Sequence, residues 1–212
     1  MHVIVPVKSL KNAKKRLSAV LTLEQRTELS SHMLSDILQT LHTSDVVKGV
    51  TVVSSDKAVQ ELADYYEADF LQIESDGGYS EDATHALNTL DLANYRTIGI
   101  IPADVPQLSH AELSKLEKNH AEGITLCPAI IDGGTNAMIF SMPLVVPLMF
   151  GENSLENYRS FAVDNDIPVN VELIKGLERD IDRAEDLVWL SKQSSGGRAW
   201  SFLKNLNPPL SK

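Results

Sequence analysis

The stretch VIVPVKSLKNAKKRL, at residues 3–17, begins as an apolar run and continues as a strongly basic segment. Comparable apolar runs, rich in Val and Ile, recur along the chain and are separated by longer segments with a helical period. Parallel strands joined by crossover helices produce this alternation. The sequence therefore predicts an α/β fold with one mostly parallel, twisted sheet flanked by helices. It places the further strands at residues 50–53, 70–73, 97–104, 124–131 and 169–173.

Capping residues mark two helix starts. Thr22 is followed three residues later by Gln25, and Ser109 by Glu112, and both pairs have the spacing of a capping box. The apolar residues of the first of these helices recur at intervals of three and four, which places them on one face. We expect that face to pack on the sheet through Met33, Leu34, Ile37, Leu38 and Leu41.

Length and composition favour one globular domain. A chain of 212 residues, 43% hydrophobic and 23% charged, buries enough surface to need no disulfide or structural metal. We assign the domain to residues 1–193. A linker at Ser194 to Gly197 leads into a C-terminal tail, residues 194–212, which should dock on the body or on a partner chain. Its helix-like apolar residues are Trp200, Phe202, Leu203 and Leu206.

Charge and hydropathy exclude several classes of partner. A net charge of −10 repels nucleic-acid backbones over most of the surface. The most apolar stretch, residues 138–150, is interrupted by Pro143 and Pro147 and is too short to span a membrane. The N-terminus has no signal-like leader, and the single Cys127 fits a reducing compartment, so a cytoplasmic location is expected. The same apolar stretch and the aromatic tail suggest a homodimer.

The basic segment is the first candidate site. Five of the 19 Lys and Arg residues lie directly after the first predicted strand. Ligands of open parallel sheets bind beyond the carboxyl ends of the strands, so a basic loop there can neutralise a triphosphate. The alternative is a solvated basic face of a helix. The five residues are Lys8, Lys11, Lys14, Lys15 and Arg16.

Acidic residues farther along the chain offer metal ligands. Asp104 follows an apolar strand in the motif PADVP, which directs it to the same edge of the sheet. Mg²⁺ prefers one or two carboxylates together with phosphate oxygens and water. The second carboxylate should come from the motif DIDRAED, as Asp182 or its neighbour Asp180. Because Glu185 follows three residues later, Asp182 is also placed as an N-cap.

Two further motifs suit an anion. The turn DGGTN, residues 132–136, combines glycines with a hydroxyl and an amide, although an ordinary hairpin turn has the same composition. FGENS, residues 150–154, ends in Ser154, which can cap a helix from Leu155 on. The sequence contains no GxxxxGK[ST], GxGxxG, HExxH or GxSxG motif, which argues against the usual ATPase, dinucleotide, zincin and hydrolase sites.

In their order, VPVKSLKNAKKRL, PADVP, DGGTNAM, FGENS and DIDRAEDL resemble the 2-phospho-L-lactate guanylyltransferases of coenzyme F-420 biosynthesis. The resemblance covers the chain up to about Leu190 and implies a glycosyltransferase-A-like nucleotidyltransferase fold. It implies that Asp104 and Asp182 bind Mg²⁺ and that GTP and a small phosphorylated carboxylic acid are the substrates. The catalytic residues would be Lys8, Arg16 and Asp104, and the substrate-binding residues Lys14, Thr135, Asn136, Gly151 and Ser154.

The implied reaction is transfer of GMP from GTP to 2-phospho-L-lactate, which gives lactyl-2-diphospho-5′-guanosine and pyrophosphate. Phosphoenolpyruvate is the alternative acceptor, and a sugar phosphate or molybdopterin is a more distant one. A rival of another class is a nucleotide-binding protein without catalysis. One departure concerns GYSED, residues 78–82, where many relatives have a Leu-Asn pair, so guanine contacts through Ser80 or Asp82 do not carry over.

Overall fold

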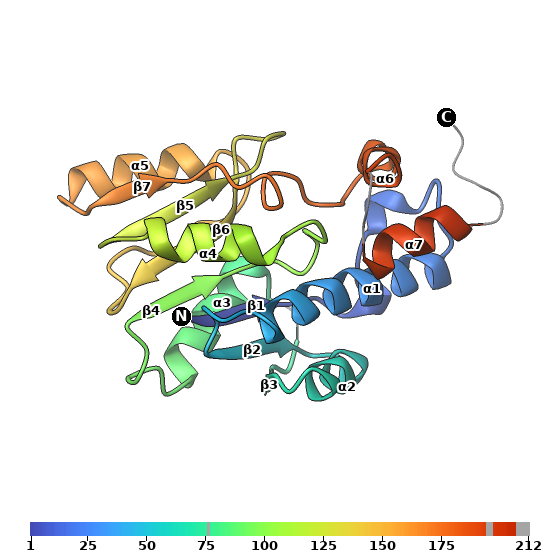
Figure 1. The fold of residues 1–212 in the computed structure, drawn as a ribbon, viewed down its shortest axis with the longest axis horizontal. Coiled ribbons are helices and arrows are strands. Elements are labelled where there is room, and N and C mark those ends of the chain that lie inside the picture. The colour runs from blue at the N-terminus through green and yellow to red at the C-terminus, as the bar shows by residue number, and fades with distance from the viewer. Residues whose placement is uncertain (76, 194–196, 207–212) are drawn as a thin grey trace.

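A seven-stranded, mostly parallel sheet forms the centre of the molecule in the computed structural model, which describes residues 1–75, 77–193 and 197–206 (Figure 1). The strand order is β3-β2-β1-β4-β6-β5-β7. All neighbours pair in parallel except β6, which runs antiparallel to both β4 and β5. The strands are β1 (His2–Pro6), β2 (Gly49–Ser54), β3 (Asp69–Gln72), β4 (Thr97–Ile100), β5 (Ile124–Pro128), β6 (Thr135–Ser141) and β7 (Val169–Val171).

Helices cover both faces of this sheet. Buried residues of α1, α2 and α4 belong to the core on one face, and those of α3 and α5 to the core on the other. The α-helices are α1 (Leu23–His42), α2 (Lys57–Tyr65), α3 (Tyr79–Thr89), α4 (His110–Asn119), α5 (Ser154–Asp164), α6 (Ala184–Ser191) and α7 (Arg198–Asn205). Two short 3-10 helices, η1 (Leu10–Asn12) and η2 (Lys15–Leu17), lie in the basic segment after β1.

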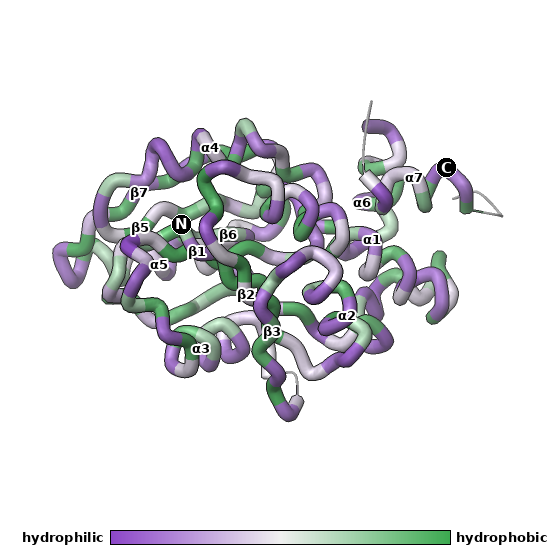
Figure 2. The backbone as a smooth tube through the Cα atoms, turned by 60° about the horizontal axis from the view of Figure 1, so that its bottom comes forward, coloured by the Kyte–Doolittle hydropathy of each residue, from purple (hydrophilic) through white to green (hydrophobic). Residues whose placement is uncertain are grey.

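Successive apolar residues of a strand point to opposite faces of the sheet, so the core has two layers. In β1, Val3 and Val5 belong to the layer beneath α1, whereas Ile4 belongs to the opposite one. All three are fully buried, as the period of two in a strand between helical layers requires. Figure 2 shows the central strands largely in the hydrophobic colour, whereas the surrounding helices alternate along their length. The predicted fold class is therefore confirmed.

The helix starts confirm two predictions and correct two others. Thr22 with Gln25, and Ser109 with Glu112, form the expected capping boxes. Ser154, however, is the first residue of α5, and Asn153, with its backbone in the left-handed region, precedes it as the cap. Asp182 is not a cap either, because α6 begins at Ala184 after the N-cap residue Arg183.

Most apolar residues of the stretch 138–150 pack in the core of the chain. Met138 and Phe140 lie in β6 and are fully buried, and Val146 is 4% exposed. Beyond β6 the chain is irregular and contains a cis peptide bond between Met142 and Pro143. Within the described residues, no helix is long and apolar enough to cross a membrane.

The C-terminal helix α7 lies against α1 (Figure 1), where both helices contribute to a third, smaller apolar cluster. The buried carboxylate of Asp36 in α1 accepts hydrogen bonds from the backbone N–H groups of Arg198 (2.7 Å) and Ala199 (3.0 Å). A side chain of one helix thus caps the start of another. Of the predicted linker, only Gly197 lies within the described residues.

We expect Asp36→Ala to lower the free energy of unfolding by about 1 kcal/mol, since it removes the cap of α7. The midpoint of urea denaturation measures the loss. Asp36→Asn keeps one acceptor oxygen and should lose less. Equal midpoints for the Ala variant and the unchanged protein would show that this cap contributes nothing to stability.

Candidate active site

A cavity of about 740 Å³ opens where the parallel strands β1 and β4 end. Segments after β1, β3 and β4 line it, together with the β5–β6 turn and the segments before α5 and α6. Ligands of open α/β sheets bind at this edge. The lining includes eight of the residues singled out from the sequence: Lys8, Lys14, Arg16, Asp104, Thr135, Asn136, Gly151 and Asp182. Ser154 is fully buried and does not line the cavity.

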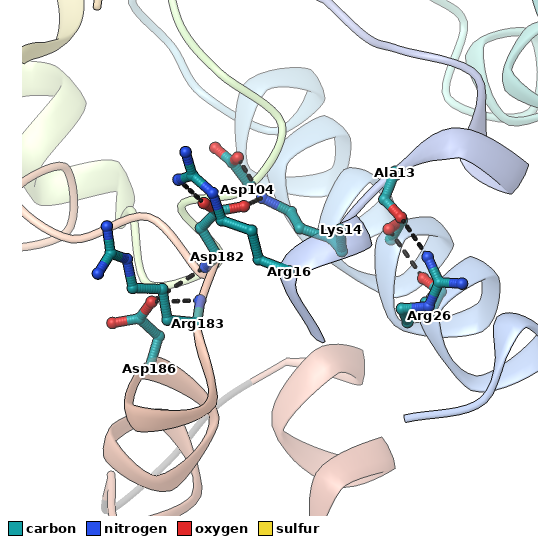
Figure 3. A network of polar contacts seen from close by, with 9 residues as sticks. Ala13, Lys14, Arg16, Arg26, Asp104, Asp182, Arg183 and Asp186 are labelled. Carbon is teal, nitrogen blue, oxygen red and sulfur yellow. Dashed lines mark hydrogen bonds and ion pairs between the residues drawn. The ribbon is translucent and has the colours of Figure 1, made fainter. Parts of the chain in front are cut away.

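Anchors at both ends hold the basic segment over the strand ends. The carboxylate of Asp56, the N-cap of α2, accepts hydrogen bonds from the backbone N–H of Leu10 (3.0 Å) and from the Ser9 hydroxyl (2.9 Å). Farther along, the Arg26 guanidinium donates to the carbonyl of Ala13 (3.1 Å; Figure 3). These contacts present the basic side chains to the cavity on a fixed backbone.

Three distant parts of the chain meet in a compact cluster of charges (Figure 3). The ammonium of Lys14 lies 2.6 Å from Asp104 Oδ2 and 3.8 Å from Asp182 Oδ1. The guanidinium of Arg16 lies 2.6 Å from Asp182 Oδ2. The Lys14 side chain is 9% exposed and both aspartates are 27% exposed, whereas Arg16 is 69% exposed. The cluster therefore has a nearly buried cation at its centre and a solvent-exposed one at its rim.

Burial and neighbouring charges shift the pKa values of Lys14 and of the adjacent Asp180. Burial alone would lower the pKa of Lys14, but the charge of Asp104, its hydrogen bond, and the charges of Asp182 and Asp180 hold it above the ordinary value. Lys14 therefore stays protonated here. Burial, together with repulsion from Asp104, raises the pKa of Asp180 to about 6, although Lys14 opposes the shift.

Asp186 sets the position of Asp182. One oxygen of the Asp186 carboxylate accepts from the backbone N–H groups of Asp182 (3.1 Å) and Arg183 (2.7 Å), and the other from Arg179 Nε (2.9 Å). Ile181 N–H in turn donates to the Asp104 carbonyl (2.9 Å), which joins the two acidic segments through the backbone. Since Asp186 caps this turn, the carboxylate of Asp182 is left to point at Lys14 and Arg16 (Figure 3).

The donor set of Asp104 and Asp182 fits a divalent cation. Both carboxylates converge on one position. The Lys14 ammonium occupies it in this structure and neutralises their negative charge. Within the part of the chain that the structure describes, no group of three or more His, Cys, Asp and Glu residues could hold a metal ion. A cation here would therefore complete its shell with phosphate oxygens and water, which is the coordination Mg²⁺ favours.

The two predicted anion loops lie side by side on another wall of the cavity. Asn153 N–H donates to the Asp132 carbonyl and Leu155 N–H to the Gly133 carbonyl, each at 3.2 Å. A Cβ at Gly134 would come within 2.9 Å of the Gly151 carbonyl, so the two loops can approach this closely only because glycine is there. DGGTN is also a hairpin turn, as the alternative interpretation had it, because it joins the antiparallel strands β5 and β6.

Two hydroxyl groups at these loops are buried without a hydrogen-bond partner among the described residues. They are Thr135 Oγ1 at the start of β6 and Ser154 Oγ at the start of α5. A buried hydroxyl that makes no hydrogen bond costs about 1–3 kcal/mol. Of the two, only Thr135 lines the cavity, so a polar ligand bound there can supply the missing hydrogen bond to Thr135 Oγ1.

Tyr79 connects α3 to this wall and was not singled out from the sequence. Its ring packs edge-to-face on Phe150 at 4.7 Å between centroids, and its hydroxyl donates to the Asn136 carbonyl (3.4 Å). The Asn136 side-chain amide donates to the Leu177 carbonyl (2.7 Å), so one of its two N–H donors is used in a contact within the protein. No sequence signal singled out the lining residues Tyr79, Gly77 and Glu81, because GYSED and the glycine before it match no phosphate or metal motif.

The fold defines the class of protein to which this geometry belongs. The chain is similar to a solved structure from Desulfovibrio desulfuricans G20, with a TM-score of 0.80 and 17% identity over 98% of this chain and 95% of that one. Further structural neighbours include a cytidylyltransferase from Leptospira borgpetersenii. The fold is thus that of nucleotidyltransferases.

The family follows from the sequence comparison. A family model described as "Guanylyl transferase CofC like" matches residues 1–210, and the chain belongs to this family. A phosphoenolpyruvate guanylyltransferase of Roseiflexus castenholzii is 36% identical, with 91% of this chain and 89% of the relative covered. A 2-phospho-L-lactate guanylyltransferase of Methanosphaera stadtmanae is 28% identical, with 96% and 89% covered. Another relative, from Colwellia psychrerythraea, is named 3-phospho-D-glycerate guanylyltransferase.

We expect Lys14→Met to make the protein depend on a divalent cation for stability. Without the ammonium, Asp104 loses its ion-pair partner and faces Asp182, which keeps only the exposed Arg16, and this should cost about 1–2 kcal/mol at this partial exposure. Thermal unfolding, followed with and without MgCl₂, should show a larger rise in Tm for the variant than for the unchanged protein. Lys15→Met, which removes a neighbouring exposed charge, is the control. Equal rises in all three proteins would contradict a cation position between the aspartates.

Proposed function

We propose that this guanylyltransferase moves GMP from GTP onto the phosphate of a three-carbon phosphorylated carboxylic acid. The observation that carries the proposal is the cavity that joins a cationic segment, two converging aspartates and an anion-binding wall. The reaction brings two anions together, and so it needs cationic groups on both sides of the reacting atoms. This combination favours transfer over the alternative of simple nucleotide binding.

The basic segment is suited to hold the triphosphate. Lys8, Lys14, Lys15 and Arg16 line the cavity, and the backbone between them is anchored by Asp56 and Arg26. In the ligand-free protein, Lys14 and Arg16 are paired with Asp104 and Asp182. The oxygens of a bound triphosphate are negatively charged, as the two carboxylates are, and can therefore replace them as partners of Lys14 and Arg16.

The wall formed by the two anion loops is suited to hold the acid. Thr135 lines the cavity and its Oγ1 has no hydrogen-bond partner among the described residues, and Gly151 exposes backbone beside it. Hydroxyl and backbone N–H donors bind phosphate and carboxylate oxygens. This assigns Thr135 and Gly151 to the acceptor and Asn136 to the same wall, whereas Ser154, expected there from its motif, is fully buried and does not line the cavity.

The chemical step requires no general base. A phosphate oxygen of the acid attacks the α-phosphorus of GTP, a new P–O bond forms, and the bond to the β-phosphate breaks with its electron pair leaving on pyrophosphate. Because the attacking oxygen is already anionic, the residues act by alignment and by neutralising charge. Lys8 and Arg16 would stabilise the triphosphate oxygens, and Lys14 would hold the phosphates over the strand ends.

Asp104 and Asp182 are the residues that would hold a divalent cation. Mg²⁺, when bound, would supply charge neutralisation at the α-phosphate and the leaving pyrophosphate. Asp186 keeps the Asp182 carboxylate turned toward this position through the backbone hydrogen bonds described above.

Among the acceptors, phosphoenolpyruvate is favoured over 2-phospho-L-lactate. Relatives named for phosphoenolpyruvate are 30–36% identical to this chain, against 27–29% for relatives named for 2-phospho-L-lactate and 28% for one named for 3-phospho-D-glycerate. All three acids carry one phosphate and one carboxylate on a three-carbon frame, so one anion-binding wall can accept the class.

Pyrophosphate release from GTP, measured in parallel with these three acids and Mg²⁺, tests the proposal. We expect turnover with at least one acid, and fastest with phosphoenolpyruvate. Asp104→Ala should reduce kcat/KM about a hundredfold or more, because a charge-stabilising group is lost from the transition state. Lys11→Ala, which changes an exposed residue of the same segment outside the cavity lining, should retain activity. Inactivity with all three acids would reject the transfer.

A further inference from the structure

The start of α3 forms a part of the cavity to which the proposed function assigns no group of the substrates. Gly77, Gly78 and Glu81 line it where the chain passes from β3 into α3. β3, β2 and β1 form one half of the sheet, whereas the anion loops adjoin β5 and β6 in the other half. If the proposed function holds, the triphosphate lies across the middle of the cavity, and its nucleoside extends toward Gly77 and Gly78.

Glu81 occupies a position from which acidic side chains usually turn back onto their own helix. It is the third residue of α3, and the equivalent residues of α1, α4 and α6 accept a hydrogen bond from the backbone N–H of the cap residue. Glu81 makes no hydrogen bond or ion pair with any described residue, and it lines the cavity instead. Its carboxylate is therefore available to a ligand.

The two glycines before α3 leave room for that carboxylate and for a flat group beside it. A Cβ at Gly77 would come within 2.6 Å of Glu81 Oε2, so the carboxylate lies over a position that only glycine leaves open. Next to Gly78, with φ of 138°, a Cβ would meet no atom within 4 Å. The first turn of α3 has no side-chain cap among the described residues, so its backbone N–H donors remain available.

The polar residues on either side of Glu81 already make hydrogen bonds within the protein. Ser80 Oγ accepts a hydrogen bond from Phe150 N–H (3.0 Å), and Asp82 Oδ1 accepts one from Gly77 N–H (3.0 Å). Asp82 is 4% exposed. These contacts explain why neither residue serves to bind a base, and they hold Glu81 and the glycines at the edge of the cavity.

Guanine matches this arrangement and adenine does not. Its Watson–Crick edge presents two adjacent donors, N1–H and N2–H, which a carboxylate accepts together, and its O6 accepts from backbone N–H groups. Adenine presents one donor beside the N1 lone pair, which faces a carboxylate unfavourably. We propose that Glu81 selects guanine by accepting hydrogen bonds from N1–H and N2–H, on a platform made by Gly77 and Gly78.

Calorimetric titration with GTP, ITP and ATP tests this assignment without depending on turnover. ITP keeps N1–H and O6 but lacks the 2-amino group, so the ratio of its Kd to that of GTP measures the contact to N2. We expect the unchanged protein to bind GTP about tenfold more tightly than ITP, as for a charge-assisted hydrogen bond. In Glu81→Ala and Glu81→Gln the ratio should fall toward one, and discrimination against ATP should weaken.

Two further variants complete the test. Gly77→Ala keeps Glu81 but displaces its carboxylate, so it should lower the GTP-to-ITP preference in the same direction. Glu74→Ala removes an exposed carboxylate from the same connection and should leave the preference unchanged. An undiminished preference in Glu81→Ala overturns the inference. Failure of the transfer itself would appear separately, as absent pyrophosphate release in the unchanged protein despite intact selection of GTP over ITP.

Discussion

The mutual neutralisation of Lys14 and Arg16 with Asp104 and Asp182 is the interaction on which the site depends. The partners are separated by 90 residues between Lys14 and Asp104, and by 166 between Arg16 and Asp182. Each segment is anchored independently, by Asp56 and Arg26 on the basic side and by Asp186 on the acidic side. The ion pairs between the two segments offset the repulsion among the like charges that each anchored segment presents at partial burial.

The sheet supplies the geometry that brings these segments together. β1 and β4 are neighbours and run in parallel, so the basic segment after β1 and Asp104 after β4 leave the sheet at the same edge. The third apolar cluster then joins η2, α1, α6 and α7 through Leu17, Leu29, Leu187 and Leu203. Burial of these side chains outside the sheet core keeps the Asp182 segment against the basic loop.

The alternation of apolar runs with segments of helical period was sufficient to predict a mostly parallel sheet flanked by helices. It could not predict that β6 inserts antiparallel between β4 and β5, since the pairing partner of a buried strand is not written in its own residues. The capping predictions for Ser154 and Asp182 were wrong for a related reason. Capping depends on the exact residue at which a helix begins. Asn153 occupies the N-cap position of α5 without a side-chain capping hydrogen bond, and the Asp186 carboxylate accepts the hydrogen bond from the N-cap residue of α6.

The prediction that separate motifs share one cavity succeeded for Lys8, Lys14, Arg16, Asp104 and Asp182. Lys8, Lys14, Arg16 and Asp104 follow predicted parallel strands, whose carboxyl ends lie at one edge of a sheet. The role proposed for Glu81 was not predicted, because the carboxylate is distinguished by a hydrogen bond that it does not make with its own helix. Glu112 occupies the same helical position and closes a capping box with Ser109, whereas Glu81 follows Gly78, which has no side chain to form one.

The backbone hydrogen bonds between the β5–β6 turn and the start of α5 carry a consequence for how this family could change its acceptor. Because Asp132 and Gly133 are bonded to Asn153 and Leu155, and Gly134 packs on the Gly151 carbonyl, neither loop can shift alone. A larger acid would need coordinated replacement of both segments. Divergence, or redesign, of acceptor choice should therefore proceed by exchanging the two loops as one unit, while single substitutions tune affinity within the existing shape.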